Sequence, residues 1–308
     1  MTIGRATTKE RLDYGWRVLG QATGVLAARL RPASTERPAA SATLSPNVMF
    51  NAARAPALGR ERSALERFDL YLYDVMNSPR LDGQIVFEYG TLLRAIGRWS
   101  GLRVLDVGTG RSTFPRWMSR EGAVVTTFDL SKPAERSWGG FQERVNDLVG
   151  RRPRAMRAVA GSMRCLPFAD ASFDLVTSLS VVEHLDTDLP ARTFVPYDEQ
   201  QRRLAQVLDE MMRVVSPGGL LYVTSECCDF ERATFDRWKP AYYYDEGPPL
   251  SGAWPAQDVP RLFYEYVAGH GCALVGGVQF ASAQIGREEY WSWRGPYFSG
   301  FSMLARKP

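Results

Sequence analysis

Histidine and cysteine are scarce: this chain of 308 residues has two histidines and four cysteines. The cysteines, at positions 165, 227, 228 and 272, form no C-x-x-C pair, so the sequence has no zinc-ligand pattern and we expect no bound metal. Thiols placed in this way favour a reduced, cytoplasmic protein over a disulfide-bonded secreted one. An apolar run of about 18 residues is also missing, and the first residues lack the compact apolar region of a signal peptide. We therefore expect no transmembrane segment and a cytoplasmic location.

A large excess of one charge is lacking over most of the chain. The net charge is +4, and residues 1–66 hold ten Lys or Arg residues against five Asp or Glu residues, which leaves the rest near neutral. A nucleic-acid interface depends on clustered basic residues that neutralise phosphates. We therefore expect no nucleic-acid partner.

The interpretation depends on residues 102–130. An apolar run that includes Val104 to Val107 is followed by Gly108-Thr109-Gly110, a helix-like segment, and a second apolar run that ends at Asp129. This order predicts a βαβ unit. Glycines at such a turn let the backbone approach a ligand closely. An acidic residue roughly 20 residues after the glycines is placed to accept hydrogen bonds from a ribose, which predicts a nucleoside-containing cofactor.

The glycine turn does not match a dinucleotide-binding fingerprint. The sequence Gly108-Thr109-Gly110 continues as Arg-Ser-Thr, so the third glycine of G-x-G-x-x-G is missing. Asp106 lies just before the turn, where a carboxylate repels a pyrophosphate and suits a cationic sulfonium. A nicotinamide-dependent oxidoreductase is therefore the weaker alternative.

Further motifs follow in order along residues 85–225. They are Leu166-Pro167-Phe168, Phe173-Asp174-Leu175-Val176, Glu183-His184-Leu185, and a helix that ends in Ser216-Pro217-Gly218-Gly219 before a strand. Together with the glycine turn, this set resembles the class I S-adenosylmethionine-dependent methyltransferases, in the subgroup called methyltransferase type 11-like. The resemblance implies a three-layer, Rossmann-like α/β sandwich with a seven-stranded, mostly parallel sheet and an antiparallel last strand. It also implies S-adenosyl-L-methionine as cofactor and S-adenosyl-L-homocysteine as product.

The resemblance implies a cofactor-binding role for ten residues. Asp106, Gly108 and Gly110 are expected at the methionine end, Asp129 at the ribose, Ser162 and Met163 at the adenine, and Ser178 and Leu179 on the methyl-transfer side. Thr109 and Leu130 are also expected to bind the cofactor. The chain departs from the subgroup where Gly161-Ser162 replaces the usual Gly-Asp. A serine hydroxyl can accept from an adenine amino group, but without the strength of a charge-assisted bond. Backbone contacts at Met163 are the remaining means of holding the adenine.

His184 is the candidate catalytic residue. A neutral imidazole can accept the proton of a substrate hydroxyl during methyl transfer, because its pKa lies near working pH. The alternative is that His184 opens a helix and makes only local hydrogen bonds. Some relatives bind a divalent metal through a Glu three residues before the Glu-His pair, but Ser180 occupies that position here.

Residues 1–63 are expected to form a helical extension and a linker, and residues 64–308 the catalytic domain. Leu12, Trp16, Leu19 and Leu26 give the extension an amphipathic face, and residues 32–46 are rich in Pro, Ala, Ser and Thr. This helix is interpreted as packing on the domain or on a partner chain, including a second copy in a homodimer, or as contacting a membrane surface.

Within the domain, helices are expected over residues 64–76, 82–99, 131–149, 204–215 and 258–270. Strands are expected over residues 156–160, 220–224, 273–280 and 297–306. Substrate-side insertions are expected near residues 186–203 and 226–255, because α/β folds place their sites at the carboxyl ends of the strands. Phe194 and Tyr197 lie in the first insertion, and the second is rich in aromatic residues.

Together these features predict methyl transfer to a hydroxyl of a small molecule or glycan. N-methylation of a small-molecule amine stays open, because an amine can react without a dedicated base. A non-catalytic cofactor-binding or partner-binding protein is the other alternative. We interpret Tyr71 and Tyr73 as packing or surface residues, with closure over the methionine part of the cofactor as the alternative. We interpret the basic run at residues 151–157 as a solvated loop, with binding of an acidic substrate as the alternative.

Overall fold

The structure is a computed structural model that describes residues 47–51, 81–110, 112, 114–130, 156–188, 193–228, 254–280 and 299–308. Several expectations lie outside these residues. They are the amphipathic helix, the linker, the helices at 64–76 and 131–149, the run at 151–154, and most of the insertion at 226–255.

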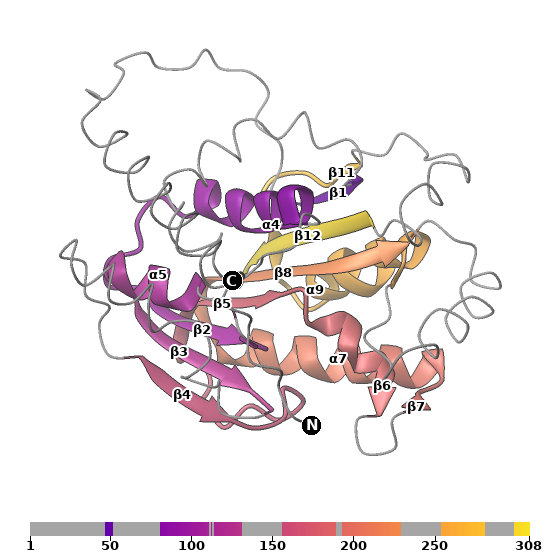
Figure 1. Cartoon of the computed structure of the whole chain (residues 1–308), viewed down its shortest axis with the longest axis horizontal. Coiled ribbons are helices and arrows are strands. Elements are labelled where there is room, and N and C mark those ends of the chain that lie inside the picture. The colour runs from indigo at the N-terminus through magenta and orange to yellow at the C-terminus, as the bar shows by residue number, and fades with distance from the viewer. Residues whose placement is uncertain are drawn as a thin grey trace, which may run out of the picture.

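The described strands form one ten-stranded sheet with the main order β11-β1-β12-β8-β5-β2-β3-β4, beside a separate two-stranded ribbon (Figure 1). Its centre is parallel: β2 pairs with β3 and β5, β3 with β4, and β5 with β8. The last strand, β12, runs antiparallel to β8. The predicted α/β class and antiparallel last strand are therefore confirmed, and the strand number exceeds seven because short strands join the sheet. The strands are β1 (Val48–Asn51), β2 (Arg103–Val107), β3 (Val124–Asp129), β4 (Arg157–Ala160), β5 (Phe173–Leu179), β8 (Val215–Cys228), β9 (Trp254–Pro255), β10 (Ala273–Leu274), β11 (Gln279–Phe280) and β12 (Ser299–Arg306), with β6 (Thr187–Asp188) and β7 (Thr193–Phe194) in the ribbon.

Alternating side chains divide the core between the two faces of the sheet, because successive residues of a strand point to opposite sides. Val104 packs with α4 (Leu81–Ala95) and α5 (Phe114–Arg120). Leu105, its neighbour in β2, packs on the other side with α7 (Tyr197–Val214) and the segment that contains Phe263. Helices thus cover both faces, which gives the three layers that the resemblance implied (Figure 1).

Helix α7 begins at Tyr197, earlier than the expected start at residue 204. The predicted insertion at 186–203 is therefore wrong for residues 197–203. The first turns escaped notice because they are strongly charged on their outer side, where Glu199 pairs with Arg203 at 2.8 Å and with Arg202 at 3.0 Å. Tyr197 is buried, and its hydroxyl donates to the Asp258 carboxylate.

The C-terminal elements are more broken than the sequence predicts. The expected helix at 258–270 is a 3-10 turn, η3 (Ala256–Asp258), a π-helical segment, η4 (Pro260–Glu265), and a short α9 (Tyr266–Gly269). The expected strand at 273–280 is two short strands, β10 and β11, separated by a segment in which Gly276 has a φ of +80°. Strand β10 pairs with β12, whereas β11 pairs with β1.

Strand β1 corrects the predicted domain boundary at residue 63. It lies in the sheet between β12 and β11, so residues 47–51 belong to the domain. Asn47 fixes its entry: the buried side-chain amide donates to the Val275 carbonyl at 2.8 Å and accepts from the Leu304 N–H at 2.7 Å. A four-residue strand with distant partners leaves no local periodicity, which explains why the sequence did not reveal it.

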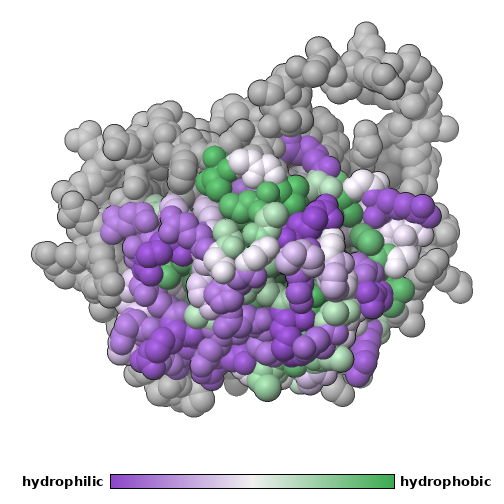
Figure 2. All heavy atoms as spheres, turned by 180° about the vertical axis from the view of Figure 1, so that it is seen from behind, coloured by the Kyte–Doolittle hydropathy of each residue, from purple (hydrophilic) through white to green (hydrophobic). Residues whose placement is uncertain are grey.

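Seen from behind, the described surface is hydrophilic over its lower part, and apolar side chains gather in its upper middle part (Figure 2). Among the described residues, two large hydrophobic side chains are well exposed, Val124 at 52% and Leu130 at 59%. Leu130 directly follows β3 at the carboxyl end of the sheet. An apolar side chain exposed there is available to a ligand.

Candidate active site

The candidate site lies at the carboxyl ends of β2, β3, β4 and β5. Strand β2 has β3 on one side and β5 on the other, so the chain order reverses at β2. Open α/β sheets bind ligands in the crevice that such a reversal creates. The topology therefore brings the segments after these strands together at one edge, as the sequence predicted.

The glycine turn after β2 is tightly packed. Gly108 and Gly110 have φ angles of +77° and +53°, which L side chains adopt only with strain. The Gly108 N–H donates to the Phe128 carbonyl at 2.7 Å, which ties the turn to β3. A Cβ on Gly108 would lie 2.2 Å from Cγ1 of Val181. Gly110 is exposed and would meet only its own turn, so the open side of the turn is at Gly110.

Asp106 points inward rather than toward the crevice. It is 3% exposed, and its two carboxylate oxygens accept hydrogen bonds from Thr177 at 2.7 Å and Thr109 at 2.8 Å. Burial raises the pKa of Asp106, the two threonine hydroxyls oppose that shift, and the Asp129 charge adds to it. Both carboxylate oxygens of Asp106 and the Thr109 hydroxyl are thus already hydrogen-bonded beneath the turn, and direct ligand contact by these two residues stays a prediction.

Asp129 and Leu130 are placed at the crevice. Oδ2 of Asp129 accepts the Gly110 N–H at 2.7 Å, so the acidic residue and the open side of the glycine turn are adjacent. Asp129 is only partly buried, and Leu130 beside it is largely exposed. The structure thus joins the predicted ribose-binding carboxylate to the glycine turn and places an apolar side chain next to it.

The 161–172 loop, which links β4 to β5, begins beside Asp129. The Gly161 N–H donates to the Asp129 carbonyl at 2.8 Å. Ser162 is partly buried, and its hydroxyl accepts the Arg164 N–H at 3.3 Å within a local turn. Met163, like Val159 and Phe168, is partly buried and packs against the core that contains Phe128 and Leu166. Both predicted adenine-side residues therefore lie just after the carboxyl end of β4, with the Ser162 hydroxyl turned toward its own loop.

Ser178 does not line the crevice with its side chain. It is fully buried, and its hydroxyl has no hydrogen-bond partner among the described residues. Leu179, the next residue of β5, packs against the α4–α5 side of the core and is partly exposed. Because successive residues of a strand point to opposite faces, the side chain of Ser178 points to the face opposite that of Leu179. Only the backbone of Ser178 therefore remains available for the predicted cofactor contact.

His184 lies on a 3-10 turn, η2 (Val182–Asp186), that follows β5. Its backbone N–H donates to the Val181 carbonyl at 3.0 Å, and its side chain is exposed. Nearby protein atoms still remove water from the ring, and this desolvation lowers the pKa of His184, opposed by the charges of Asp186 and Asp129. His184 therefore follows the carboxyl end of β5, the strand beside β2 and its glycine turn.

Several structural residues were missed by the sequence interpretation. Thr177 holds Asp106, and Glu183 is buried with its carboxylate accepting the Ser225 hydroxyl at 2.6 Å. Glu210 and Arg213 bind the 161–172 loop, and their i, i+3 spacing on a helix was a signal that could have indicated a pair.

The described residues contain no group of three or more His, Cys, Asp or Glu side chains arranged to hold a metal ion. None of the described helices combines the length and the apolar character that a membrane crossing requires.

The central part of the chain is similar to known proteins. Residues 105–223 match the family described as "Methyltransferase domain". The demethylmenaquinone methyltransferase of Renibacterium salmoninarum is 31% identical over 171 residues, which cover 55% of this chain and 59% of that protein. The malonyl-[acyl-carrier protein] O-methyltransferase of Pseudescherichia vulneris is 31% identical over 134 residues, or 44% of this chain and 43% of that protein. The chain thus spans a little more than half the length of the first relative and less than half the length of the second.

A solved structure is similar over a longer part of the chain. It is magnesium protoporphyrin IX methyltransferase from Synechocystis PCC 6803 with bound S-adenosyl-L-homocysteine, at 14% identity and a TM-score of 0.45, with 82% of this chain and 99% of that chain covered. The order of the parallel strands, the glycine turn with Asp129 beside it, and the family match over residues 105–223 agree with one another. Residues 105–223 thus match a methyltransferase domain in sequence and have the parallel strand order of a Rossmann-like α/β fold.

Proposed function

We propose that the protein transfers the methyl group of S-adenosyl-L-methionine to a hydroxyl of a small molecule or glycan. The observation that carries the proposal is the contact between Asp129 and the Gly110 N–H at the carboxyl end of the sheet, next to the exposed Leu130. The carboxylate suits the ribose of the cofactor, and the open glycine backbone suits its methionine part. The apolar side chain suits the adenine. One relative that matches the chain is named as an O-methyltransferase, which favours an oxygen acceptor.

The residues at the crevice fit this cofactor. Asp129 would accept hydrogen bonds from the ribose hydroxyls, and Leu130 would pack on the adenine. The backbone at Ser162 and Met163 would meet the adenine edge, and Gly110 leaves room for the methionine part. When bound, the cofactor supplies a methyl group that its sulfonium has already activated. The protein therefore has mainly to align the acceptor with that methyl group and to exclude water.

His184 is the proposed proton acceptor. Desolvation lowers its pKa, which keeps the imidazole neutral and able to accept a proton at working pH. His184 lies on η2, directly after the carboxyl end of β5, where we expect the acceptor to enter. A general base of this kind contributes about 10²–10⁴-fold to the rate.

The cofactor assignment is tested by calorimetry on the full chain. S-adenosyl-L-homocysteine should bind to the wild type, NADH should not, and Asp129→Ala should lose most of the affinity for the nucleoside. Binding of NADH in place of S-adenosyl-L-homocysteine would favour the oxidoreductase alternative. Unchanged affinity in Asp129→Ala would remove the proposed ribose contact.

The acceptor class is tested with labelled cofactor and two panels, one of hydroxyl compounds and glycans and one of amines. We expect transfer to the hydroxyl panel, with turnover reduced about 10²-fold or more in His184→Ala. Transfer to amines with His184→Ala near wild-type rate would favour N-methylation. Binding of cofactor with no transfer to either panel would favour a non-catalytic protein.

We also propose that the enzyme acts in the cytoplasm on a non-nucleic-acid acceptor. The near-neutral charge of the chain after residue 66 supports the second point. We also propose that the protein forms a homodimer or that its N-terminal helix contacts a membrane. Sedimentation tests the first proposal, and vesicle binding tests the second.

A further inference from the structure

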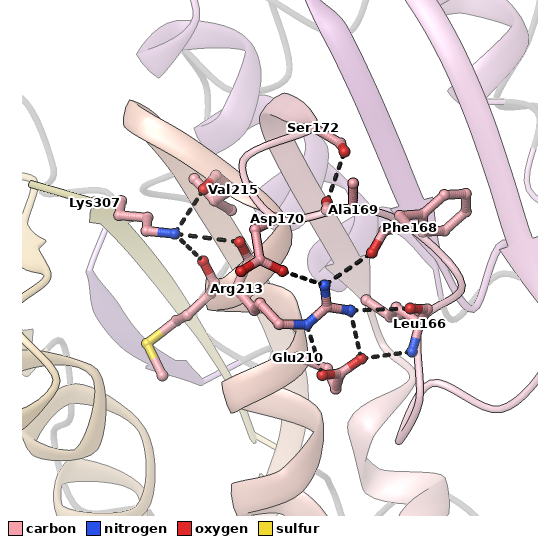
Figure 3. A network of polar contacts seen from close by, with 10 residues as sticks. Leu166, Phe168, Ala169, Asp170, Ser172, Glu210, Arg213, Val215 and Lys307 are labelled. Atoms are coloured by element: carbon pink, nitrogen blue, oxygen red, sulfur yellow. Dashed lines mark hydrogen bonds and ion pairs between the residues drawn. The ribbon is translucent and has the colours of Figure 1, made fainter.

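The 161–172 loop is held from below by Arg213 on α7 (Figure 3). The guanidinium donates to the Leu166 carbonyl at 2.9 Å, to the Phe168 carbonyl at 2.8 Å and to the Asp170 carboxylate at 2.7 Å. Two more hydrogen bonds go to the Glu210 carboxylate, both at 2.8 Å. The five N–H donors of an arginine are thereby all used, in a fixed fork geometry.

Glu210 completes the attachment on the same helix. Its Oε2 accepts the Leu166 N–H at 2.7 Å, so both backbone groups of Leu166 are bound by the Glu210–Arg213 pair. Hydrogen bonds from the Arg213 side chain lower the pKa of Glu210, which keeps this acceptor charged. The backbone of Arg213 contributes as well, because its carbonyl accepts the Ala171 N–H at 3.0 Å.

This attachment reaches the residues that face the crevice. Leu166 is 3% exposed and anchors the loop in the core. Cys165, just before it, donates its N–H to the Ser162 carbonyl at 3.0 Å, and the Ser162 hydroxyl accepts the Arg164 N–H. The backbone at Ser162 and Met163 is therefore held through a short turn whose far end is fixed by Arg213 and Glu210.

The identity of residue 162 makes this attachment consequential. Ser162 provides no carboxylate for the adenine amino group, and its hydroxyl is directed to its own loop. Adenine recognition at this point then depends on backbone groups, whose position has to be accurate because a hydrogen bond weakens steeply away from its preferred geometry.

We propose that Arg213 and Glu210 are positioning residues for the cofactor, which fix the backbone of the 161–172 loop so that it selects an adenine base. This inference rests on the proposed function, since it concerns the same cofactor crevice. The two side chains act through the loop and need not touch the cofactor.

Lys307 offers a matched control. Its ammonium donates to the carbonyls of Met212, Arg213 and Val215 at 2.9, 3.2 and 2.9 Å, so it caps the same helix end without contacting the loop (Figure 3). Lys307→Met should therefore disturb the end of α7 and leave the adenine-side backbone in place.

The test compares wild type, Arg213→Met, Arg213→Lys and Lys307→Met by calorimetry with two probes. The probes are S-adenosyl-L-homocysteine and S-inosyl-L-homocysteine, which carries a carbonyl in place of the adenine amino group. We expect Arg213→Met to bind the adenine probe on the order of tenfold more weakly and to lose much of its preference over the inosine probe. Arg213→Lys should rescue little, because a single ammonium cannot replace the fork. Lys307→Met should keep the preference within about twofold of wild type.

A change in the ratio of the two affinities separates positioning from simple loss of folded protein, which weakens both probes equally. If Arg213→Met does not fold, Glu210→Gln takes its place, with a smaller but same-signed loss of preference expected. Binding of both probes with wild-type ratio in folded Arg213 and Glu210 variants would overturn the inference and leave the proposed function intact. Failure of the wild type itself to bind S-adenosyl-L-homocysteine would overturn the proposed function instead.

Discussion

Substitution of Gly108 by alanine should destabilise the protein through two separable effects. The backbone φ of +77° costs a non-glycine residue about 1–2 kcal/mol. The added Cβ would also lie 2.2, 2.6 and 2.9 Å from three side-chain carbons of Val181, and overpacking of this kind costs about 1–3 kcal/mol. Valine is stiff about χ1, so the clash cannot be relieved by rotating one methyl group. We therefore expect a loss of about 2–5 kcal/mol in the free energy of unfolding.

Gly110→Ala is the matched control for the backbone effect. Gly110 also has a positive φ, +53°, but its Cβ would meet only the Gly108 carbonyl at 3.9 Å. Its loss should therefore be confined to about 1–2 kcal/mol. Urea unfolding followed by tryptophan fluorescence measures both variants, and the chain has eight tryptophans for the signal.

The double variant Gly108→Ala/Val181→Ala tests the clash itself. Removal of the Val181 methyl groups should restore about 1–3 kcal/mol relative to Gly108→Ala, after the effect of Val181→Ala alone is subtracted. Because the Val181 carbonyl accepts the N–H of His184, displacement of Val181 should also lower the turnover that we assign to His184. Equal losses in Gly108→Ala and Gly110→Ala, with no rescue in the double variant, would refute the reasoning.

Two further variants test buried polar contacts. Burial, and then the charges of Glu226 and Glu88, raise the pKa of Glu183 well above 4.5, opposed by the Ser225 hydroxyl. The contribution of Glu183 to stability is therefore full below pH 4.5 and is lost as the pH rises through the raised folded-state pKa, by at most about 1.4 kcal/mol per pH unit. Urea unfolding at increasing pH should show a shallower decline in Glu183→Gln, and identical slopes would contradict the assignment. Asn47→Ala should cost about 1–3 kcal/mol, because it leaves the buried Leu304 N–H without its acceptor, and an unchanged unfolding midpoint would show that β1 is not needed.

Local patterns in the sequence predicted the parts of the fold that have a clear period. The run from Val104 to Val107, the glycine turn and Asp129 form the expected βαβ unit, and the motif at Phe173 begins β5. These elements could be predicted because their apolar residues and turn residues are adjacent in the chain. The start of α7 was missed because its first turns are charged on the outer face.

Pairings between distant residues could not be predicted from the sequence. The inward direction of Asp106 depends on Thr177 in β5, and the burial of Ser178 depends on which face of the sheet the pleat presents to α7. Likewise, nothing near Arg213 in the sequence indicates the carbonyls of Leu166 and Phe168. The sequence therefore predicted which segments follow the parallel strands, while the structure shows which of their side chains are buried and which are exposed.

The position of β1 has a consequence for how the protein is made. Its sheet partner β12 is synthesised nearly 250 residues later, so residues 48–51 must wait on the order of tens of seconds on the ribosome at ~5–20 residues per second. Until then, the backbone groups of that segment lack their β12 partner, and an unpaired strand can form hydrogen bonds with a non-native strand. Among the described strands, the first and the last in the chain pair with each other, so this part of the sheet can form only after synthesis has reached β12.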